Sequence, residues 1–306
     1  MSEEVRCVLR AGASTGECPI WSEAEARLYW IDVQEPALHR FDPATGHDEH
    51  WTLPAHIGCY GLCDGEKVLV ALRTGLAWLD LVSGALAHTA APPYDPSRFI
   101  FNDGRADPQG RFWVGPMHQP YENVPPGGPD RLPLWRFDPA TGEFTPMTDP
   151  VGTSNGVAWS PDGETMYHSD TSQHVIWAYR FHGGEGRLLD KRVLAEVPGP
   201  KGHGPDGGCC DAEGYYWSAI FGEGRLIRFD PKGRVEREVA IPVRHPTMCA
   251  FGGPDGRTAF VTSAGRMVSP AQRQAPPFDG GLFSFRAPAP GFPAHHVRPP
   301  ALHGPG

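Results

Sequence analysis

Short apolar runs alternate with turns along this chain, and the pattern recurs six times. One recurring phrase is a run of β-forming residues that ends in a turn rich in Asp, Pro, Ser or Gly. Such a phrase is typical of a hairpin between two strands. Successive copies begin about 40 to 57 residues apart, the spacing of propeller blades. The copies are HRFDPATG (39–46), WLDLVSG (78–84), WRFDPATG (135–142), AYRFHGGEG (178–186), IRFDPKG (227–233) and FSFRAPAPG (283–291).

A second phrase precedes each copy. It consists of an apolar run, a tight turn and an aromatic-rich run, as in VAWSPDGETMYHSD. Together the two phrases supply four strands per repeat. The repeats therefore predict an all-β fold, a six-bladed β-propeller forming a single domain over residues 1–306, whose closure leaves few sheet edges exposed. A β-sandwich is the alternative, but the constant order of the phrases argues against it.

Some segments depart from the strand pattern, and no long helix is expected. Residues 118–134 are too rich in Pro and Gly for a strand and predict an inserted loop. Residues 266–281 are a second candidate for such a loop. Four tryptophans fall within predicted strands and are expected to pack between neighbouring blades: Trp21, Trp113, Trp159 and Trp217.

Polar side chains recur at one register of the repeats. Counting back eight positions from the turn of the second phrase gives an acid or an amide in four of the six repeats. The other two repeats carry Ile57 and Met248 there. The first strand of each propeller blade lines the central channel, so equivalent positions converge on the axis. We expect four oxygen-bearing side chains at one level of the channel: Glu17, Asn102, Asn155 and Asp206.

Such a ring of oxygen atoms predicts a site for one divalent metal ion. Two of the four side chains are carboxylates, and no His or Cys shares their register. Oxygen-only ligation favours Ca²⁺, with Mg²⁺ or Mn²⁺ next, while Zn²⁺ and Fe²⁺ stay among the alternatives. The competing interpretation is a metal-free channel whose polar groups are bridged by water. A bound metal would polarise a carbonyl or activate a water whose proton a neighbouring carboxylate takes.

Composition and charge exclude several classes of protein. The net charge of −9 and the absence of a Lys/Arg cluster argue against a nucleic-acid partner and, more weakly, against an anionic membrane. The seven cysteines follow no disulfide or zinc spacing and indicate reduced thiols. The N-terminus has no apolar signal region, and no apolar run approaches the ~18 residues of a membrane span. A soluble, cytoplasmic protein is expected, with no indication of its oligomeric state.

Two stretches, residues 12–16 and 152–156, match the G-x-S-x-G pattern of serine hydrolases. A nucleophile elbow needs a strand, a turn and a helix, whereas both stretches precede predicted strands. We interpret them as loops that lead into the channel. His118 and His203 are expected on loops at the channel mouth, where a histidine could bind a substrate hydroxyl. His118 is the stronger candidate.

These motifs resemble the regucalcin/gluconolactonase (senescence marker protein-like) family of six-bladed propellers, and more distantly the phosphotriesterase-type and paraoxonase-type propellers. The resemblance covers nearly the whole chain. It implies that Glu17, Asn155 and Asp206 hold the metal, that Asn102 contacts substrate or metal-bound water, and that Asp206 is the general acid/base. It also implies a small sugar lactone as substrate. Its most specific pieces are GECPIW (16–21), NDG (102–104), DPQG (107–110), SNGV (154–157) and PDG (205–207).

Two positions depart from the family pattern. Animal members carry an Arg where this chain has Ile100, and a Glu close to the position of Pro120. Both contact substrate in those proteins, so the resemblance leaves open which lactone this chain would take, and pentonolactones fit as well as gluconolactone. A promiscuous aryl-ester or organophosphate hydrolase is the second enzymatic interpretation, to which Ile100 points slightly. A non-enzymatic calcium-binding or scaffold propeller is the third.

Overall fold

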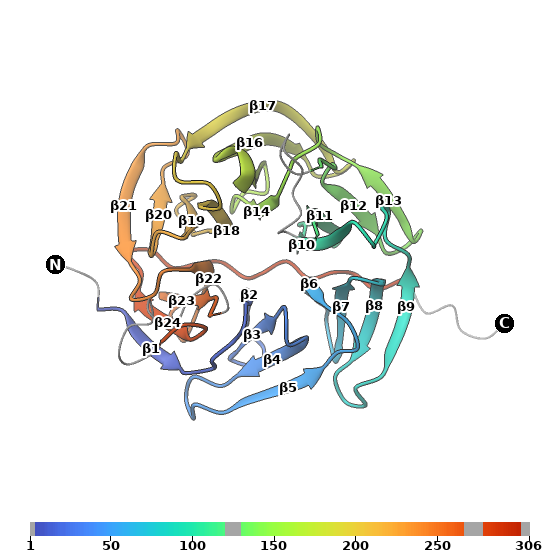
Figure 1. The fold of residues 1–306 in the computed structure, drawn as a ribbon, viewed down its shortest axis with the longest axis horizontal. Coiled ribbons are helices and arrows are strands. Elements are labelled where there is room, and N and C mark those ends of the chain that lie inside the picture. Colours follow the sequence, from blue (N-terminus) through green and yellow to red (C-terminus); the bar gives the residue numbers. More distant parts are fainter. Residues whose placement is uncertain (1–3, 120–129, 266–277, 301–306) are drawn as a thin grey trace.

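The computed structural model describes residues 4–119, 130–265 and 278–300. Six antiparallel sheets of four strands each stand around a central axis (Figure 1), which confirms the predicted six-bladed β-propeller. The first three blades are β2 (Gly16–Ser22), β3 (Arg27–Asp32), β4 (Ala37–Phe41) and β5 (Asp48–Thr52); β6 (Ile57–Leu62), β7 (Lys67–Leu72), β8 (Gly75–Asp80) and β9 (Leu86–Ala90); β10 (Phe99–Ala106), β11 (Phe112–His118), β12 (Trp135–Asp138) and β13 (Glu143–Pro146).

The last three blades complete the ring. Within the described ranges the helical structure is limited to the short 3-10 helix η2 (Thr171–Gln173) in blade 4. The strands are β14 (Ser154–Trp159), β15 (Thr165–Asp170), β16 (Val175–His182) and β17 (Arg187–Glu196); β18 (Gly204–Cys210), β19 (Tyr216–Phe221), β20 (Arg225–Phe229) and β21 (Val235–Ala240); β22 (Pro246–Gly252), β23 (Thr258–Ser263), β24 (Leu282–Arg286) and β1 (Arg6–Leu9).

The N-terminal strand closes the ring. β1 pairs antiparallel with β24, with Arg6 opposite Ser284 and Cys7 opposite Phe283. Blade 6 therefore takes its fourth strand from the start of the chain, and β24 lies next to β1 in Figure 1. The expectation that residues 283–291 form an outer hairpin is wrong, because only β24 of that segment is a strand. β1 thus pairs with the otherwise unpartnered edge of β24, and joining segments from both ends of the chain in one sheet holds the first and last blades together.

The predicted packing of tryptophans between blades is confirmed. Trp21 of blade 1 stacks on Phe260 of blade 6, with ring centroids 5.6 Å apart. Trp113 of blade 3 meets Trp159 of blade 4 edge-on at 5.7 Å. Trp217 of blade 5 contacts the first strand of blade 6 in the same way. These aromatic contacts bury large surfaces at the joints between blades.

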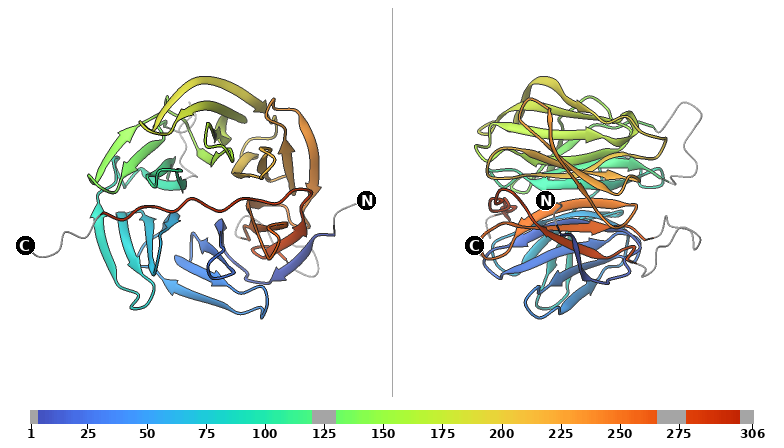
Figure 2. Two further views of the ribbon diagram at one scale, coloured as in Figure 1. Left: turned by 180° about the vertical axis from the view of Figure 1, so that it is seen from behind. Right: turned by 90° about the vertical axis from the view of Figure 1, so that its left-hand side faces the viewer.

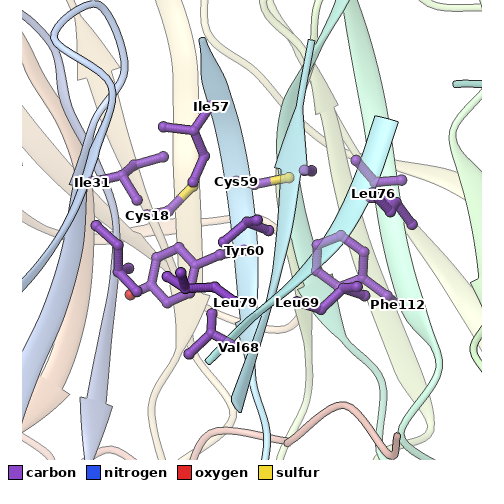
Figure 3. Close-up of a cluster of buried hydrophobic side chains, with 14 of the residues drawn as sticks. Cys18, Ile31, Ile57, Cys59, Tyr60, Val68, Leu69, Leu76, Leu79 and Phe112 are labelled. Carbon is purple, nitrogen blue, oxygen red and sulfur yellow. The ribbon is translucent and has the colours of Figure 1, made fainter. Parts of the chain in front are cut away.

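The core continues between the remaining blades. Figure 3 shows apolar side chains from blades 1, 2 and 3 that interdigitate around β6 and β7. Strands that are apolar on both faces, such as KVLVAL in β7, can be buried because each sheet is covered by a neighbouring blade on either side. The residues labelled there are Cys18, Ile31, Ile57, Cys59, Tyr60, Val68, Leu69, Leu76, Leu79 and Phe112.

After β24 the chain crosses one face of the propeller as an extended C-terminal strap, residues 287–300 (Figures 1 and 2). Backbone hydrogen bonds attach the strap to blades on both sides of the axis: Ala212 N–H of blade 5 donates to Pro290 O at 2.8 Å, and Val297 N–H donates to Leu62 O of blade 2 at 2.8 Å. A cavity of ≈ 80 Å³ lies between the strap and the lower channel. Because the strap contacts the ends of the inner strands, it lies on the face opposite their starting ends.

The described ends of the two predicted inserted loops, residues 118–119, 130–134 and 278–281, lie on the face where the inner strands begin. Residues 130–134 form no strand apart from an isolated bridge between Leu132 and Val151, as expected for the loop at 118–134. The prediction placed the start of this loop one residue too early, because His118 still belongs to β11. Residues 120–129, including Pro120, and residues 266–277 of the second predicted loop lie outside the described residues. In the part of the chain that the structure describes, no helix has the length and apolarity needed to span a bilayer.

Candidate metal and substrate site

The four polar residues counted from the sequence lie near the start of the first strand of their blades. Each inner hairpin has a register shift at this level, in all six blades. Glu17 and Asn155 directly precede the shift, whereas Asn102 and Asp206 lie within it. A bulge changes the direction of the side chains around it. The four residues therefore share one register in the sequence and one level of the channel, but they occupy two slightly different positions relative to the register shift.

Asn102 and Asn155 are in direct contact. Asn102 Nδ2 donates to Asn155 Oδ1 at 2.8 Å and to the backbone carbonyl of Ser154 at 2.9 Å. Asn155 Nδ2 in turn donates to Thr171 Oγ1 at 2.8 Å. Thr171 Oγ1 donates to the carbonyl of Pro205 at 2.7 Å, the residue before Asp206. One chain of hydrogen bonds therefore links the site residues of blades 3, 4 and 5.

Two buried carboxyl groups stand close together at this level. Asp206 is 7% exposed and Asp103 is 3% exposed. Burial, together with the charge of Asp103, raises the pKa of Asp206 well above its usual range. Burial also raises the pKa of Asp103, although Arg105 and backbone N–H groups act in the opposite direction. One of those N–H groups is that of Val157, which donates to Asp103 Oδ2 at 2.9 Å.

The side chain of Arg105 extends from blade 3 across the channel to blades 1 and 6. Its guanidinium donates to the carbonyl of Pro19 at 3.2 Å and lies 3.4 Å from the sulfur of Met248. In the described chain no ion pair joins Arg105 to Asp103 or Asp206. Desolvated carboxylates without a paired cation are costly, and protonation or a bound cation relieves that cost.

The residues present fit a hard divalent cation. Asp206 is an uncompensated buried carboxyl, Glu17 is half-buried at the same level, and Asn155 keeps its amide oxygen on the side away from Thr171. Among the residues that the structure describes, no three His, Cys, Asp or Glu side chains form a metal cluster by themselves. Any site here therefore depends on amide oxygen as well as on two carboxylates, a donor set typical of Ca²⁺ rather than of Zn²⁺.

His118 lies at the mouth of blade 3. It ends β11 opposite Phe99, its ring meets the Phe99 ring edge-on at 5.5 Å, and it is 7% exposed. Its Nε2 is 3.5 Å from Asp130 Oδ2. Asn102 follows Phe99 by three residues, so His118 lies on the mouth side of the metal level. Ile100, one of the two positions that depart from the family pattern, is buried in β10.

Two further histidines, His203 and His245, lie at the mouth of blades 5 and 6. The His203 ring packs on Gly222, where an added Cβ would lie 2.5 Å from it. The His245 ring lies 4.6 Å from that of Phe221, so the end of β19 separates the two histidines. Burial lowers the pKa of His245 to about 4, and the charges of Arg244 and His203 act in the same direction. His245 is therefore neutral at physiological pH, and the positive charge on this side of the mouth is that of Arg244.

The G-x-S-x-G stretches do not form a nucleophile elbow. Ser154 begins strand β14, with no helix after it, and is fully buried. Its Oγ is hydrogen-bonded to His168 Nε2 at 2.7 Å. Burial lowers the pKa of His168 to about 4, so this imidazole is neutral at physiological pH. A hydroxyl enclosed in this way has no access to substrate.

Sequence reasoning assigned no role to Asp103, Thr171 or Arg105. Asp103 stood within the NDG motif, and an acid in an otherwise apolar inner strand is a usable signal. Arg105 stood in the same strand and gave a similar signal. Thr171 carried none, because its importance comes from contacts with Asn155 and Pro205, which are distant in sequence.

Comparison with known proteins gives a consistent result. Residues 15–265 match the family model described as SMP-30/Gluconolactonase/LRE-like region. The 6-deoxy-6-sulfogluconolactonase of Pseudomonas putida is 40% identical over 95% of this chain and 97% of its own length. Regucalcin of Xenopus laevis is 31% identical over 92% of this chain and 94% of its own length.

A solved structure supports the same relationship. The calcium-binding protein regucalcin from Agrobacterium tumefaciens superimposes with a TM-score of 0.88 at 27% sequence identity. The superposition covers 97% of this chain and 98% of that one. Both the fold and its order of blades are therefore shared over the whole ring.

Proposed function

Since this chain belongs to the SMP-30/gluconolactonase/LRE-like family, we propose that it hydrolyses a small sugar lactone in a reaction that depends on a divalent metal ion. The observation that carries the proposal is the buried carboxyl of Asp206. Burial and the charge of Asp103 raise its pKa, so this carboxyl favours uptake of a proton or of a cation, and it lies at the same level of the channel as Glu17 and Asn155. The name of the Pseudomonas putida relative supports this substrate class, and the description of the Agrobacterium tumefaciens regucalcin as a calcium-binding protein supports a calcium ion.

The reaction needs one water and one proton relay. Water adds to the lactone carbonyl carbon, the ring C–O bond breaks, and the ring oxygen takes a proton, which gives a hydroxy acid. Asp206 accepts the proton of the attacking water and returns it to the departing oxygen. Glu17, Asn155 and Asp206 would hold the cation, which when bound polarises the carbonyl.

Asn102 has only its amide oxygen left to interact with substrate or water at this site. Both of its amide protons are used by Ser154 and Asn155, so only its Oδ1 can engage a further partner. An amide oxygen accepts hydrogen bonds, and it would therefore orient an O–H group of the substrate or of the attacking water. His118 at the mouth would contact a sugar hydroxyl farther from the reacting carbonyl.

A lactone with an anionic substituent is favoured by the blade 5 and 6 side of the mouth. Arg244 is exposed and has no ion-pair partner within the described residues, and its charge acts on His245. His203 stands beside them, three residues before Asp206. The Pseudomonas putida relative is named for a lactone with a sulfonate, which fits this arrangement. We propose that Arg244 binds the anionic end of the substrate through its charge, and that the two histidines beside it supply hydrogen bonds.

The test is a pH-indicator assay of lactone hydrolysis on glucono-, galactono-, xylono- and arabinono-lactones and on 6-deoxy-6-sulfogluconolactone. Each is assayed after chelation and after restoring Ca²⁺, Mn²⁺, Mg²⁺, Zn²⁺ or Fe²⁺. We expect turnover that disappears on chelation and returns with one ion, and that falls at least 100-fold in Asp206→Asn. Turnover that survives chelation would contradict the metal dependence. Hydrolysis of aryl esters or organophosphates but of no lactone would favour the esterase interpretation, and metal binding without any turnover would favour a binding protein.

A further inference from the structure

The hydrogen-bond chain through Asn102, Asn155 and Thr171 has a fixed direction. A hydroxyl has one proton to donate, and that of Thr171 points to the carbonyl of Pro205 at 2.7 Å, which can only accept. Toward Asn155, Thr171 Oγ1 is therefore an acceptor. The group of Asn155 that faces Thr171 must be its Nδ2, at 2.8 Å. Its Oδ1 then points to the other side.

The Asn102 end of this hydrogen-bond chain requires the same direction. The carbonyl of Ser154 can only accept, so the group that Asn102 presents to it is Nδ2. The second proton of that amide then points to Asn155 and requires an acceptor there, at 2.8 Å. Two backbone carbonyls, one in blade 4 and one in blade 5, thus determine which atom each amide presents.

This direction matters because only one of the two atoms of the Asn155 amide can bind a cation. An amide oxygen is a ligand, whereas an NH₂ group in its place would repel the ion. We propose that Thr171 is a positioning residue that holds Oδ1 of Asn155 in the orientation required for cation binding. The proposal rests on the cation site of the proposed function, and it concerns a residue that does not itself contact the ion.

Thr171 is placed rigidly enough for this task. It is the first residue of η2, whose N-cap Asp170 accepts the Ser172 N–H at 2.9 Å. Its own N–H donates to the carbonyl of Thr153 at 3.1 Å. Its backbone is therefore tied to the loop that leads into β14, on which Asn155 lies.

The test compares Thr171→Val with Thr171→Ser. Valine keeps the shape of threonine but has no hydroxyl, so the Asn155 Nδ2 would lose its acceptor, while serine keeps the hydroxyl. The readout is the Kd for Ca²⁺ of the full-length protein by isothermal titration calorimetry, or for Mn²⁺ where Ca²⁺ gives no heat. We expect Thr171→Val to weaken binding about tenfold, the range for residues that orient metal ligands, and Thr171→Ser to remain within about twofold of the parent.

Thr247→Val is the matched control. Thr247 Oγ1 donates to the carbonyl of Gly16 at 2.6 Å, the residue before Glu17, as Thr171 does before Asp206. Thr247 contacts no amide of the site, so its loss should lower the melting temperature without changing the Kd by more than about twofold. Equal weakening in both valine variants, or an unchanged Kd in Thr171→Val, would overturn the role of Thr171. If the parent protein binds no divalent cation, the proposed metal site fails, which is a distinguishable result.

Discussion

Asp32 and Asp170 stand at the same place in blades 1 and 4, each at the end of the second strand of its blade. Asp32 accepts the backbone N–H groups of residues 14 and 15, at 2.8 and 3.1 Å. Asp170 accepts those of residues 152 and 153, at 3.0 and 3.1 Å. These loops lead directly to Glu17 and Asn155. Two carboxylates that cannot reach a substrate thus fix the backbone that presents two of the proposed ligands.

Asp170→Asn should lower the free energy of unfolding by about 2 kcal/mol, because a fully buried acceptor of several N–H and O–H groups loses its charge and part of its accepting capacity. Those hydrogen bonds hold the pKa of Asp170 below its usual range despite burial. Its contribution is therefore present above the pKa of the unfolded state and is lost as the pH falls through the lower, folded value. Urea denaturation measures the change. Asp95→Asn, at an exposed turn, is the control and should cost less than half as much; equal costs would contradict the argument.

The buried imidazole of His168 should make the protein sensitive to acid. Its pKa is lowered from 6.5 to about 4 in the folded state, so between these values the unfolded chain binds more protons. Stability then rises with pH across this window, and the imidazole contributes a loss of about 3 kcal/mol on full acidification. His168→Gln should flatten the dependence when unfolding is measured from pH 7 to 4 in chelator. The raised pKa values of Asp103 and Asp206 act in the opposite sense in both proteins, so the difference between the two curves isolates His168. The exposed His88→Gln should retain the parent slope, and a parent-like slope in His168→Gln would contradict the prediction.

Gly156→Ala should be much more damaging than Gly142→Ala. Both glycines have positive φ, 64° and 74°. A Cβ at Gly156 would lie 2.3 Å from the Tyr216 hydroxyl, whereas one at Gly142 would meet nothing within 4 Å. We expect a loss of about 1 kcal/mol at Gly142 and at least twice that at Gly156, together with weaker cation binding because Asn155 is adjacent. Denaturant titration and calorimetry measure the two effects, and equal losses would show that the contact with Tyr216 is easily relieved.

Removal of residues 1–9 should open the ring. Without β1 the edge of β24 has no partner, and blade 6 keeps only three strands. The melting temperature should fall by at least about 5 °C and the protein should become prone to aggregation. Removal of residues 1–3 alone is the control and should leave the melting temperature unchanged. An equally stable protein without β1 would show that ring closure adds little to stability.

Arg244→Gln should change specificity rather than chemistry. If Arg244 binds an anionic end of the substrate, kcat/KM for a sulfonated or carboxylated lactone should fall about tenfold, while that for a neutral lactone changes less than twofold. Arg187→Gln, on the outer strand of blade 4, is the control and should affect neither. An equal fall in kcat/KM for both substrates would show that Arg244 supports the structure of the mouth and does not bind the anionic group.

The six-bladed propeller could be predicted because both recurring phrases of a blade are formed by residues that are close together in the sequence. Turns, strands and their order follow from neighbouring residues, and the position of Asn102 or Asp206 follows from counting back to a turn. β1 was not predicted, because RCVL is too short to signal a strand and its partner lies at the other end of the chain. Thr171 was missed for the same reason, since its contacts join blades 4 and 5. What could not be predicted was therefore mainly what depends on contact between blades.

The C-terminal strap has a kinetic consequence. It lies across one end of the channel and is attached to inner hairpins on both sides of the axis. Small molecules therefore enter and leave at the opposite end. In the proposed reaction, the lactone and the acid formed from it pass through the same opening, one after the other. The acid still in the channel excludes the next lactone. The acid should therefore inhibit competitively. Where the cation of the proposed site and Arg244 bind the acid as they bind the lactone, release of the acid, rather than ring opening, limits the rate.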